Sequence, residues 1–289
     1  MRRGDRHLQR ACATWMCLAT FAACAPDDTA PPVEPPDTIA EDTAAGPDSD
    51  VVPPAEEVEI DGLVGVAVDP DDAPVAGASV LCCTLTSCLV FDAGPDGRFR
   101  FPAEPGTRVA VKTHADLDAE PRHAVALLPV ALGDVADVDV GALYAPALSA
   151  GLPIGDASAQ AQSFAVAEGL ELTLRTDALR PAFGERLRDL AAGRVPDRHL
   201  RVYPGLEGED VLATFALHPF DAHSDAPIGV RVALPIPAGA SVRLRTIGAL
   251  DGALSEPVDA TSDGAWVATR AGEGITELTW LVVSAPSAR

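Results

Sequence analysis

The chain has 289 residues and is strongly acidic, with a formal charge of −22 that arises from 43 acidic and 21 basic residues. Such a surface repels phosphate backbones and anionic lipid, which excludes nucleic-acid partners and polybasic membrane contacts. Hydrophobic residues make up 47% of the chain but aromatic residues only 4%, so its cores must be built from small aliphatic side chains. That composition favours two shallow β-domains over one large globule.

The first 23 residues have the pattern of a secretory signal peptide. A basic segment, residues 1–10, is followed by an apolar stretch, residues 11–23, that is too short to cross a membrane as a helix. Removing this signal, which carries +3, leaves −25 on the mature chain. Simple secretion with cleavage after Ala23-Cys24-Ala25 is the alternative to the acylation described next, and it is disfavoured because Pro26 follows the cut.

The end of the signal, Phe21-Ala22-Ala23-Cys24, resembles the lipobox of bacterial lipoproteins, although Phe21 stands where leucine is usual. The resemblance implies lipidation of Cys24 with diacylglyceryl and palmitate chains, and two or more chains give stable membrane anchoring. By the same resemblance, Ala25 in place of aspartate implies the outer membrane, on its periplasmic or surface face. The expected partner is therefore a lipid bilayer in the cell envelope.

Residues 24–57 are predicted to be a disordered linker. After Cys24 they contain eight prolines and ten acidic residues, with no lysine or arginine. Such a composition buries too little apolar surface to offset chain entropy. The segment would hold the folded part roughly 30 Å from the membrane as a flexible coil, or about 100 Å as extended polyproline.

Residues 58–145 are predicted to form the first β-sandwich domain, because their apolar residues alternate with polar ones. In residues 98–101 the alternation puts Phe99 and Phe101 on one face. Seven strands are expected, over residues 58–68, 78–83, 88–91, 98–101, 108–113, 124–132 and 138–143.

Gly62-Leu63-Val64, Pro74-Val75-Ala76-Gly77-Ala78-Ser79-Val80 and Asp96-Gly97-Arg98-Phe99-Arg100-Phe101 resemble the carboxypeptidase regulatory-like domain, a small transthyretin-like β-sandwich. The turn before the last motif is longer than usual and begins Phe91-Asp92, where Thr-Asp is common. The resemblance covers about 85 residues and implies a non-catalytic module used for stability, spacing or binding.

The mature chain keeps three cysteines besides Cys24. Cys83 and Cys88 flank a four-residue loop and are disulfide candidates, since an exported protein meets an oxidising compartment. Cys82 would then be a buried thiol, and Cys82–Cys88 is the rival pairing. Three thiolates crowded in one hairpin without a nearby histidine disfavour a zinc site.

The turns at residues 69–74 and 92–97 carry five aspartates and are expected at the same end of the sandwich. Converging carboxylates can bind calcium, but aspartate is also common in turns for its own hydrogen bonding. Calcium binding is therefore left open, and no EF-hand spacing supports it. The aspartates are Asp69, Asp71, Asp72, Asp92 and Asp96.

Residues 146–289 are predicted to form a second β-domain with one short inserted helix. Asp177 could cap a helix through about residue 192, with an apolar stripe that includes Leu187 and Leu190, and Gly193 would end it. The Leu234-Pro235, Asp263-Gly264 and Leu278-Thr279-Trp280 segments loosely resemble ZU5-like β-domains of bacterial surface proteins. That resemblance supports a second sandwich.

No motif for catalysis stands out. The chain has no Gly-x-Ser-x-Gly elbow, no His-Glu-x-x-His pair and no Gly-rich phosphate loop, so no catalytic residue and no cofactor are predicted. His218, Asp221, His223 and Asp225 lie within eight residues, but a polar loop explains them better than a metal site.

Three functions follow as hypotheses. The first is a lipid-anchored, non-catalytic binding or structural module with an envelope polysaccharide or envelope protein as its partner. The second is an envelope hydrolase with a catalytic second domain, which a deep pocket holding a histidine with a carboxylate or serine would favour. The third is a purely structural subunit, which a large exposed apolar patch would favour.

Overall fold

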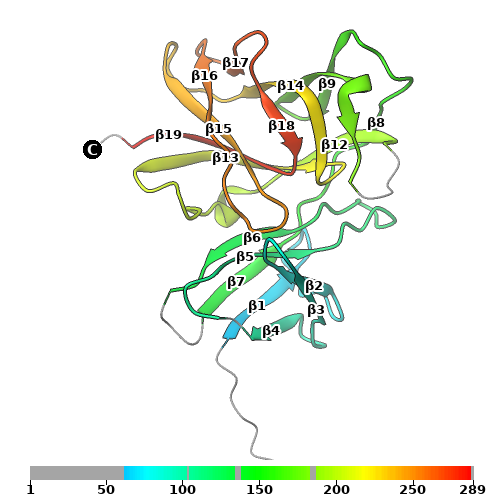
Figure 1. Cartoon of the computed structure of the whole chain (residues 1–289), viewed down its shortest axis with the longest axis vertical. Coiled ribbons are helices and arrows are strands. Elements are labelled where there is room, and N and C mark those ends of the chain that lie inside the picture. Colours follow the sequence, from blue (N-terminus) through cyan, green and yellow to red (C-terminus); the bar gives the residue numbers. More distant parts are fainter. Residues whose placement is uncertain (1–61, 103, 134–137, 183–186, 288–289) are drawn as a thin grey trace, which may run out of the picture. The chain divides into compact units, whose positions relative to one another are not determined.

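The computed structural model describes residues 62–102, 104–133, 138–182 and 187–287 (Figure 1). The expected signal, Cys24 and the acidic linker lie outside these residues. The described chain is built of strands and contains two short 3-10 turns, η1 (Thr176–Ala178) and η2 (Asp197–His199). The all-β class is therefore confirmed. No helix among these residues has the length and apolarity to cross a membrane.

The first seven strands form two sheets and follow the expected strand positions closely (Figure 1). One sheet has the order β4-β1-β7, with β1 antiparallel to β4 and parallel to β7, and the other has the order β3-β2-β5-β6. Their bounds are β1 Gly62–Val68, β2 Ser79–Cys83, β3 Cys88–Asp92, β4 Arg98–Pro102, β5 Arg108–Thr113, β6 Leu127–Ala131 and β7 Val138–Tyr144.

These two sheets share one apolar core. Phe99 and Phe101 are both buried in it, as their alternation with Arg98 and Arg100 predicted, and their ring centroids lie 5.8 Å apart. The opposite sheet contributes alternate residues of its own strands, among them Val109 and Val111 of β5. The pattern of period two thus decides which side chains enter this core.

A third sheet of twelve strands uses the remaining residues and has the order β8-β12-β13-β19-β15-β16-β17-β14-β10-β9, with β11 and β18 paired to β14. It curls around a second core, because β9 also contacts β12. Its bounds are β8 Leu152–Pro153, β9 Ala161–Ala167, β10 Leu170–Arg175, β11 Leu179–Arg180, β12 Asp189–Arg194, β13 Glu209–His218, β14 Ala222–Ala233, β15 Ser241–Ile247, β16 Val258–Ser262, β17 Trp266–Thr269, β18 Ile275–Leu278 and β19 Trp280–Pro286.

The helix expected over residues 177–192 is wrong. The described part of this segment holds η1, β11 and most of β12, which pairs with β13 and β8. Leu190 and Ala192 enter the core of the third sheet, whereas Ala191 between them packs into a different core. A strand buried on both faces gives a run of apolar residues that periodicity alone does not separate from a helix.

A third apolar core joins the first two sheets to the third. It combines Leu127 and Tyr144 with Val195, Ala216 and Trp280, among others. The Trp280 indole nitrogen Nε1 also donates to the carbonyl oxygen of Val125 at 2.8 Å. Residues Glu57–Arg289 therefore form one compact unit. Along the chain, the strands of the first two sheets end at residue 144 and those of the third sheet begin at residue 152. Independent folding of residues 58–145 and 146–289 stays a prediction.

Candidate functional site

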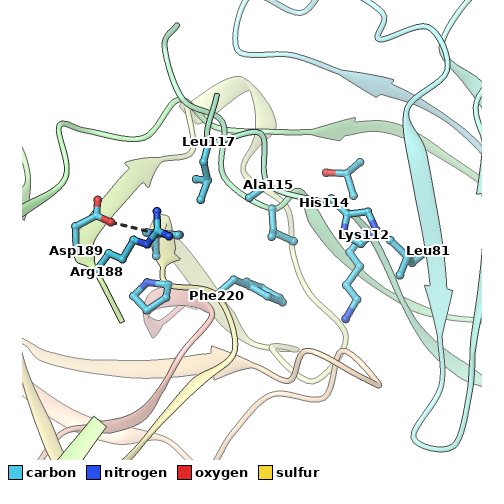
Figure 2. A pocket seen from close by; sticks show the side chains of 12 residues that line it. Leu81, Lys112, His114, Ala115, Leu117, Arg188, Asp189 and Phe220 are labelled. Atoms are coloured by element: carbon cyan, nitrogen blue, oxygen red, sulfur yellow. Dashed lines mark ion pairs between the residues drawn. The ribbon is translucent and has the colours of Figure 1, made fainter. Parts of the chain in front are cut away.

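A cavity of about 640 Å³ lies between the second and third sheets (Figure 2). Most of its lining comes from three segments that are distant in the sequence: β5 with the loop after it, the start of β12, and the turn between β13 and β14. Leu81 of β2 and Val125 before β6 complete it. Sites for small ligands commonly measure roughly 300–1,000 Å³. Its polar lining residues are Lys112, Thr113, His114, Arg188, Asp189 and His218.

Strand alternation aims three of these side chains at the cavity. In β5, Val111 points into the core between the first two sheets, so Lys112 points to the other face. In β13, Leu217 enters the core of the third sheet, which turns His218 outward beside the cavity. In β12, Leu190 also enters the core of the third sheet, so its neighbour Asp189 points toward the cavity.

Lys112 is the only lysine of the chain. Its Nζ donates a hydrogen bond to the carbonyl oxygen of Ala249 at 2.8 Å and lies 5.6 Å from the centroid of the Phe220 ring. Burial lowers the pKa of Lys112, and the nearby charge of Asp221 opposes that shift. Within the described residues the ammonium group has no carboxylate partner at ion-pair distance, so its charge is not neutralised by direct contact.

Asp189 is the one carboxylate among the described lining residues, and an arginine compensates it. Arg122 Nη1 donates to Asp189 Oδ2 at 2.9 Å, and both side chains are about four-fifths buried. His218 Nε2 lies 3.8 Å from Asp189 Oδ1, which is longer than a hydrogen bond. Burial lowers the pKa of His218, with Asp189 opposing the shift, so the imidazole is neutral at pH 7.

Apolar side chains form the rest of the wall. In Figure 2 the Phe220 ring lies between Lys112 on one side and Arg188 with Asp189 on the other, and Leu117 lies across from it. Leu117 is well exposed. The cavity therefore offers an aromatic face beside two cationic groups and two imidazoles, a mixture suited to binding a polar ring compound.

The histidine and aspartate cluster at residues 218–225 does not converge. His218 belongs to the cavity, whereas His223 lies between Asp221 and Glu277, at 3.7 Å and 3.6 Å. Asp225 pairs with Arg180 Nη2 at 2.6 Å. In the part of the chain that the structure describes, no group of three or more His, Cys, Asp or Glu residues could hold a metal ion.

The two aspartate-rich turns do lie next to each other, since Gly97 packs close to Pro74. Their carboxylates are nevertheless used locally. Asp69 Oδ1 accepts the N–H groups of Asp71 and Ala73, and Asp96 Oδ1 accepts that of Arg98. The Asp72 carboxylate binds Arg198 and His199 across the sheets, at 2.8 Å and 2.5 Å. Among the described residues of these turns, no three carboxylates come together as a metal site would require.

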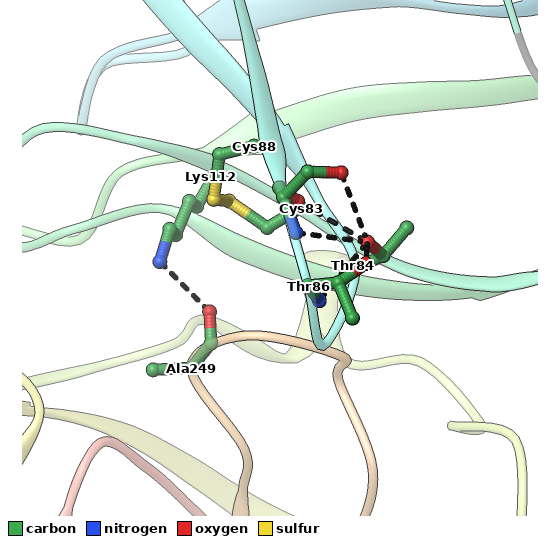
Figure 3. Close-up of a disulfide and its surroundings, with 7 residues drawn as sticks. Cys83, Thr84, Thr86, Cys88, Lys112 and Ala249 are labelled. Carbon is green, nitrogen blue, oxygen red and sulfur yellow. Dashed lines mark hydrogen bonds between the residues drawn. A yellow bond between two sulfur atoms is a disulfide. The ribbon is translucent and has the colours of Figure 1, made fainter.

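Cys83 and Cys88 are joined by a disulfide at the end of the β2–β3 hairpin, with their Cα atoms 4.0 Å apart (Figure 3). Thr84 organises the loop between them by accepting the N–H of Ser87 at 3.2 Å. Cys82 is a buried free thiol whose pKa burial raises to about 11. Closing so short a loop stabilises the fold by about 2 kcal/mol in the loop-entropy account. Lys112 and Ala249 lie beside this hairpin (Figure 3).

No protein-family model matches this chain, and no curated protein matches its sequence. The likeness to carboxypeptidase regulatory-like and ZU5-like domains therefore stays a prediction. So do the lipobox and the envelope compartment.

Sequence reasoning missed the cavity. No pattern in the sequence assigned a role to Lys112, His114, Arg188 or Asp189, although Lys112 is the single lysine of the chain. One signal was available, because a lone lysine in so acidic a chain is unusual. The partners of Lys112 come from segments more than 70 residues away, and nothing local in the sequence joins them.

Proposed function

We propose that this protein is an exported, lipid-anchored envelope protein of two β-sandwich domains that binds a small ligand in the cavity between the second and third sheets. Cys24 would carry the lipid, and residues 24–57 would space the folded part from the bilayer. Binding occurs without chemical change of the ligand, which would belong to an envelope polysaccharide.

The observation that carries this proposal is the cavity itself. Strands from two sheets hold most of its polar side chains, and the third apolar core packs these two sheets against each other. Sites on such strands need little ordering when a ligand enters, so less binding free energy is lost. The mixed lining of an aromatic ring and converging polar groups is typical of small-molecule sites.

A hydrolase is the second candidate, because the cavity holds a histidine near a carboxylate. Three features weigh against it. The His218–Asp189 separation of 3.8 Å is too long for the hydrogen bond that orients a catalytic base, and Arg122 already engages Asp189. Thr113, the one hydroxyl among the described lining residues, accepts the N–H of Ala126 at 3.2 Å instead of bonding to His218.

A role in assembly is favoured by a different surface. Strand β3 is an edge strand whose Leu89, Val90 and Phe91 are exposed, and Leu85 in the preceding loop is 70% exposed. An apolar edge without a charged residue among these three is a template for another strand. Such pairing is compatible with ligand binding in the cavity, which it leaves open.

A substitution that fills the cavity tests this proposal. Full-length Ala115→Trp protein, purified in detergent, should lose measurable binding to lipid-free envelope polysaccharide in isothermal titration calorimetry, because the indole would occupy the ligand's space. Ala238→Trp, at an exposed turn away from the cavity, is the matched control and should bind like the wild type. Equal binding by wild type and Ala115→Trp would refute a ligand site in this cavity.

A further inference from the structure

The charge of the cavity is opposite to that of the chain. The protein carries an excess of 22 negative charges, yet its only lysine and Arg188 both line this cavity. Arg188 is exposed and makes no ion pair with a described residue. The Asp189 carboxylate is matched by Arg122. Once Asp189 is paired with Arg122, the positive charges of Lys112 and Arg188 remain without an ion-pair partner among the described residues.

Two further carboxylates approach the cavity. Asp221 interacts electrostatically with Lys112 but stays beyond ion-pair distance and faces His223 at 3.7 Å. Asp116, in the loop after β5, accepts N–H groups of Asp118 and Ala119 in its own loop. Neither carboxylate is among the residues that line the cavity, and those lining residues together with Arg122 keep a net positive charge.

Lys112 also retains the means to bind a second acceptor. An ammonium group has three N–H donors, and Ala249 uses one of them. A neutral carbonyl does not cancel the positive charge. An incoming anion can therefore accept a charge-assisted hydrogen bond, which is stronger than one between neutral groups.

We propose that the ligand is an acidic sugar unit whose carboxylate or phosphate is bound by Lys112 and Arg188, an inference that rests on the proposed function. The Phe220 ring and Leu117 supply apolar contacts for the carbon face of the sugar ring. His114 and His218 supply ring nitrogens that can form hydrogen bonds with sugar hydroxyl groups. An anion on a hydroxylated ring uses every kind of group in the lining.

The test compares three small probes against the full-length protein by calorimetry: D-glucuronate, D-glucose 6-phosphate and neutral D-glucose. At least one anionic sugar should bind ten-fold or more tightly than glucose, and added salt should weaken it. The preferred anion separates a carboxylate-bearing source from a phosphate-bearing one. Absence of binding by both anionic sugars overturns the inference.

Matched variants locate the anion. Lys112→Gln and Arg188→Gln should each weaken binding of the preferred anion ten-fold or more, whereas Arg98→Gln, an exposed arginine of β4, should leave it unchanged. Since Lys112→Gln removes an internal hydrogen bond, its melting temperature is measured alongside, and the surface variant Arg188→Gln provides an independent reading. If glucose binds as tightly as glucuronate and both charge variants bind like the wild type, the proposed anionic ligand is refuted. If Ala115→Trp still abolishes binding in that case, the cavity remains the ligand site.

Discussion

Two charged groups of this protein, Glu209 and Lys112, lie in contrasting surroundings. Glu209 opens β13 and its side chain is 8% exposed. Arg245 donates two hydrogen bonds to it, at 2.7 Å and 3.0 Å, and Arg243 and Ser284 donate one each at 2.6 Å. Lys112, by contrast, has one hydrogen bond to a neutral carbonyl and borders a cavity.

The contrast separates a charge that stabilises the fold from one available for binding. All of the strong donors around Glu209 are supplied by the protein, and they lower its pKa to about 2, with Arg245 contributing most and burial opposing. Such a group has nothing left to offer a ligand. Lys112 keeps unused donors, so its interaction energy is available to a second molecule. Removing each group should therefore affect different properties.

The largest effect on stability is expected from Glu209→Gln. The substitution keeps the shape but leaves Arg245, which is 8% exposed as a residue, without its anion, and breaking a buried ion pair costs about 3 kcal/mol. Urea denaturation followed by circular dichroism measures the loss. Glu256→Gln, an exposed glutamate near β16, is the control and should change the unfolding free energy by less than about 0.5 kcal/mol.

Acid should remove the same contribution from the wild type. Because the folded-state pKa of Glu209 lies at about 2 and the ordinary value is 4.5, its stabilisation is complete above pH 4.5 and is lost as the pH falls toward about 2. The difference in unfolding free energy between wild type and Glu209→Gln should shrink over this interval. A difference that stays constant from pH 7 to pH 2.5 would contradict the ionic role of Glu209.

A smaller loss is expected from Arg122→Met. This change removes the hydrogen bonds from Arg122 to Asp189 and to the carbonyl of Ser149, at 2.9 Å and 3.3 Å, and should destabilise the fold by about 1.5 kcal/mol. It also leaves Asp189 uncompensated in the cavity, so anionic probes should bind more weakly than to wild type. Arg98→Met serves as the control in both assays. Unchanged anion binding would mean that Asp189 has no influence on the ligand.

The smallest effect on stability is expected from Lys112→Met, which keeps most of the aliphatic stem and loses one hydrogen bond, about 1 kcal/mol. Binding of the anionic probe should nevertheless fall ten-fold or more. The two values together test the comparison with Glu209. If Lys112→Met destabilises the fold as strongly as Glu209→Gln does, then Lys112 is a structural residue and not a ligand-binding one.

The first seven strands could be predicted from the sequence because their information is local. Alternation at period two marks which side chains of β4 and β5 enter the core, and the short loop between Cys83 and Cys88 brings the two sulfur atoms into range. In β12 the same local reasoning failed. Leu190, Ala191 and Ala192 are buried on both faces, and such a run has no period that distinguishes a strand from a helix.

The all-β class, the acidic surface and the positions of the early strands could be predicted from the chain alone, since these depend on composition and on the spacing of neighbouring residues. The cavity could not, because it forms only when distant strands pack together. Lys112, Asp189 and His218 meet because three strands from separate parts of the chain pack through a shared core. Which distant strands meet depends on the packing of the whole chain, and no local pattern in the sequence records it.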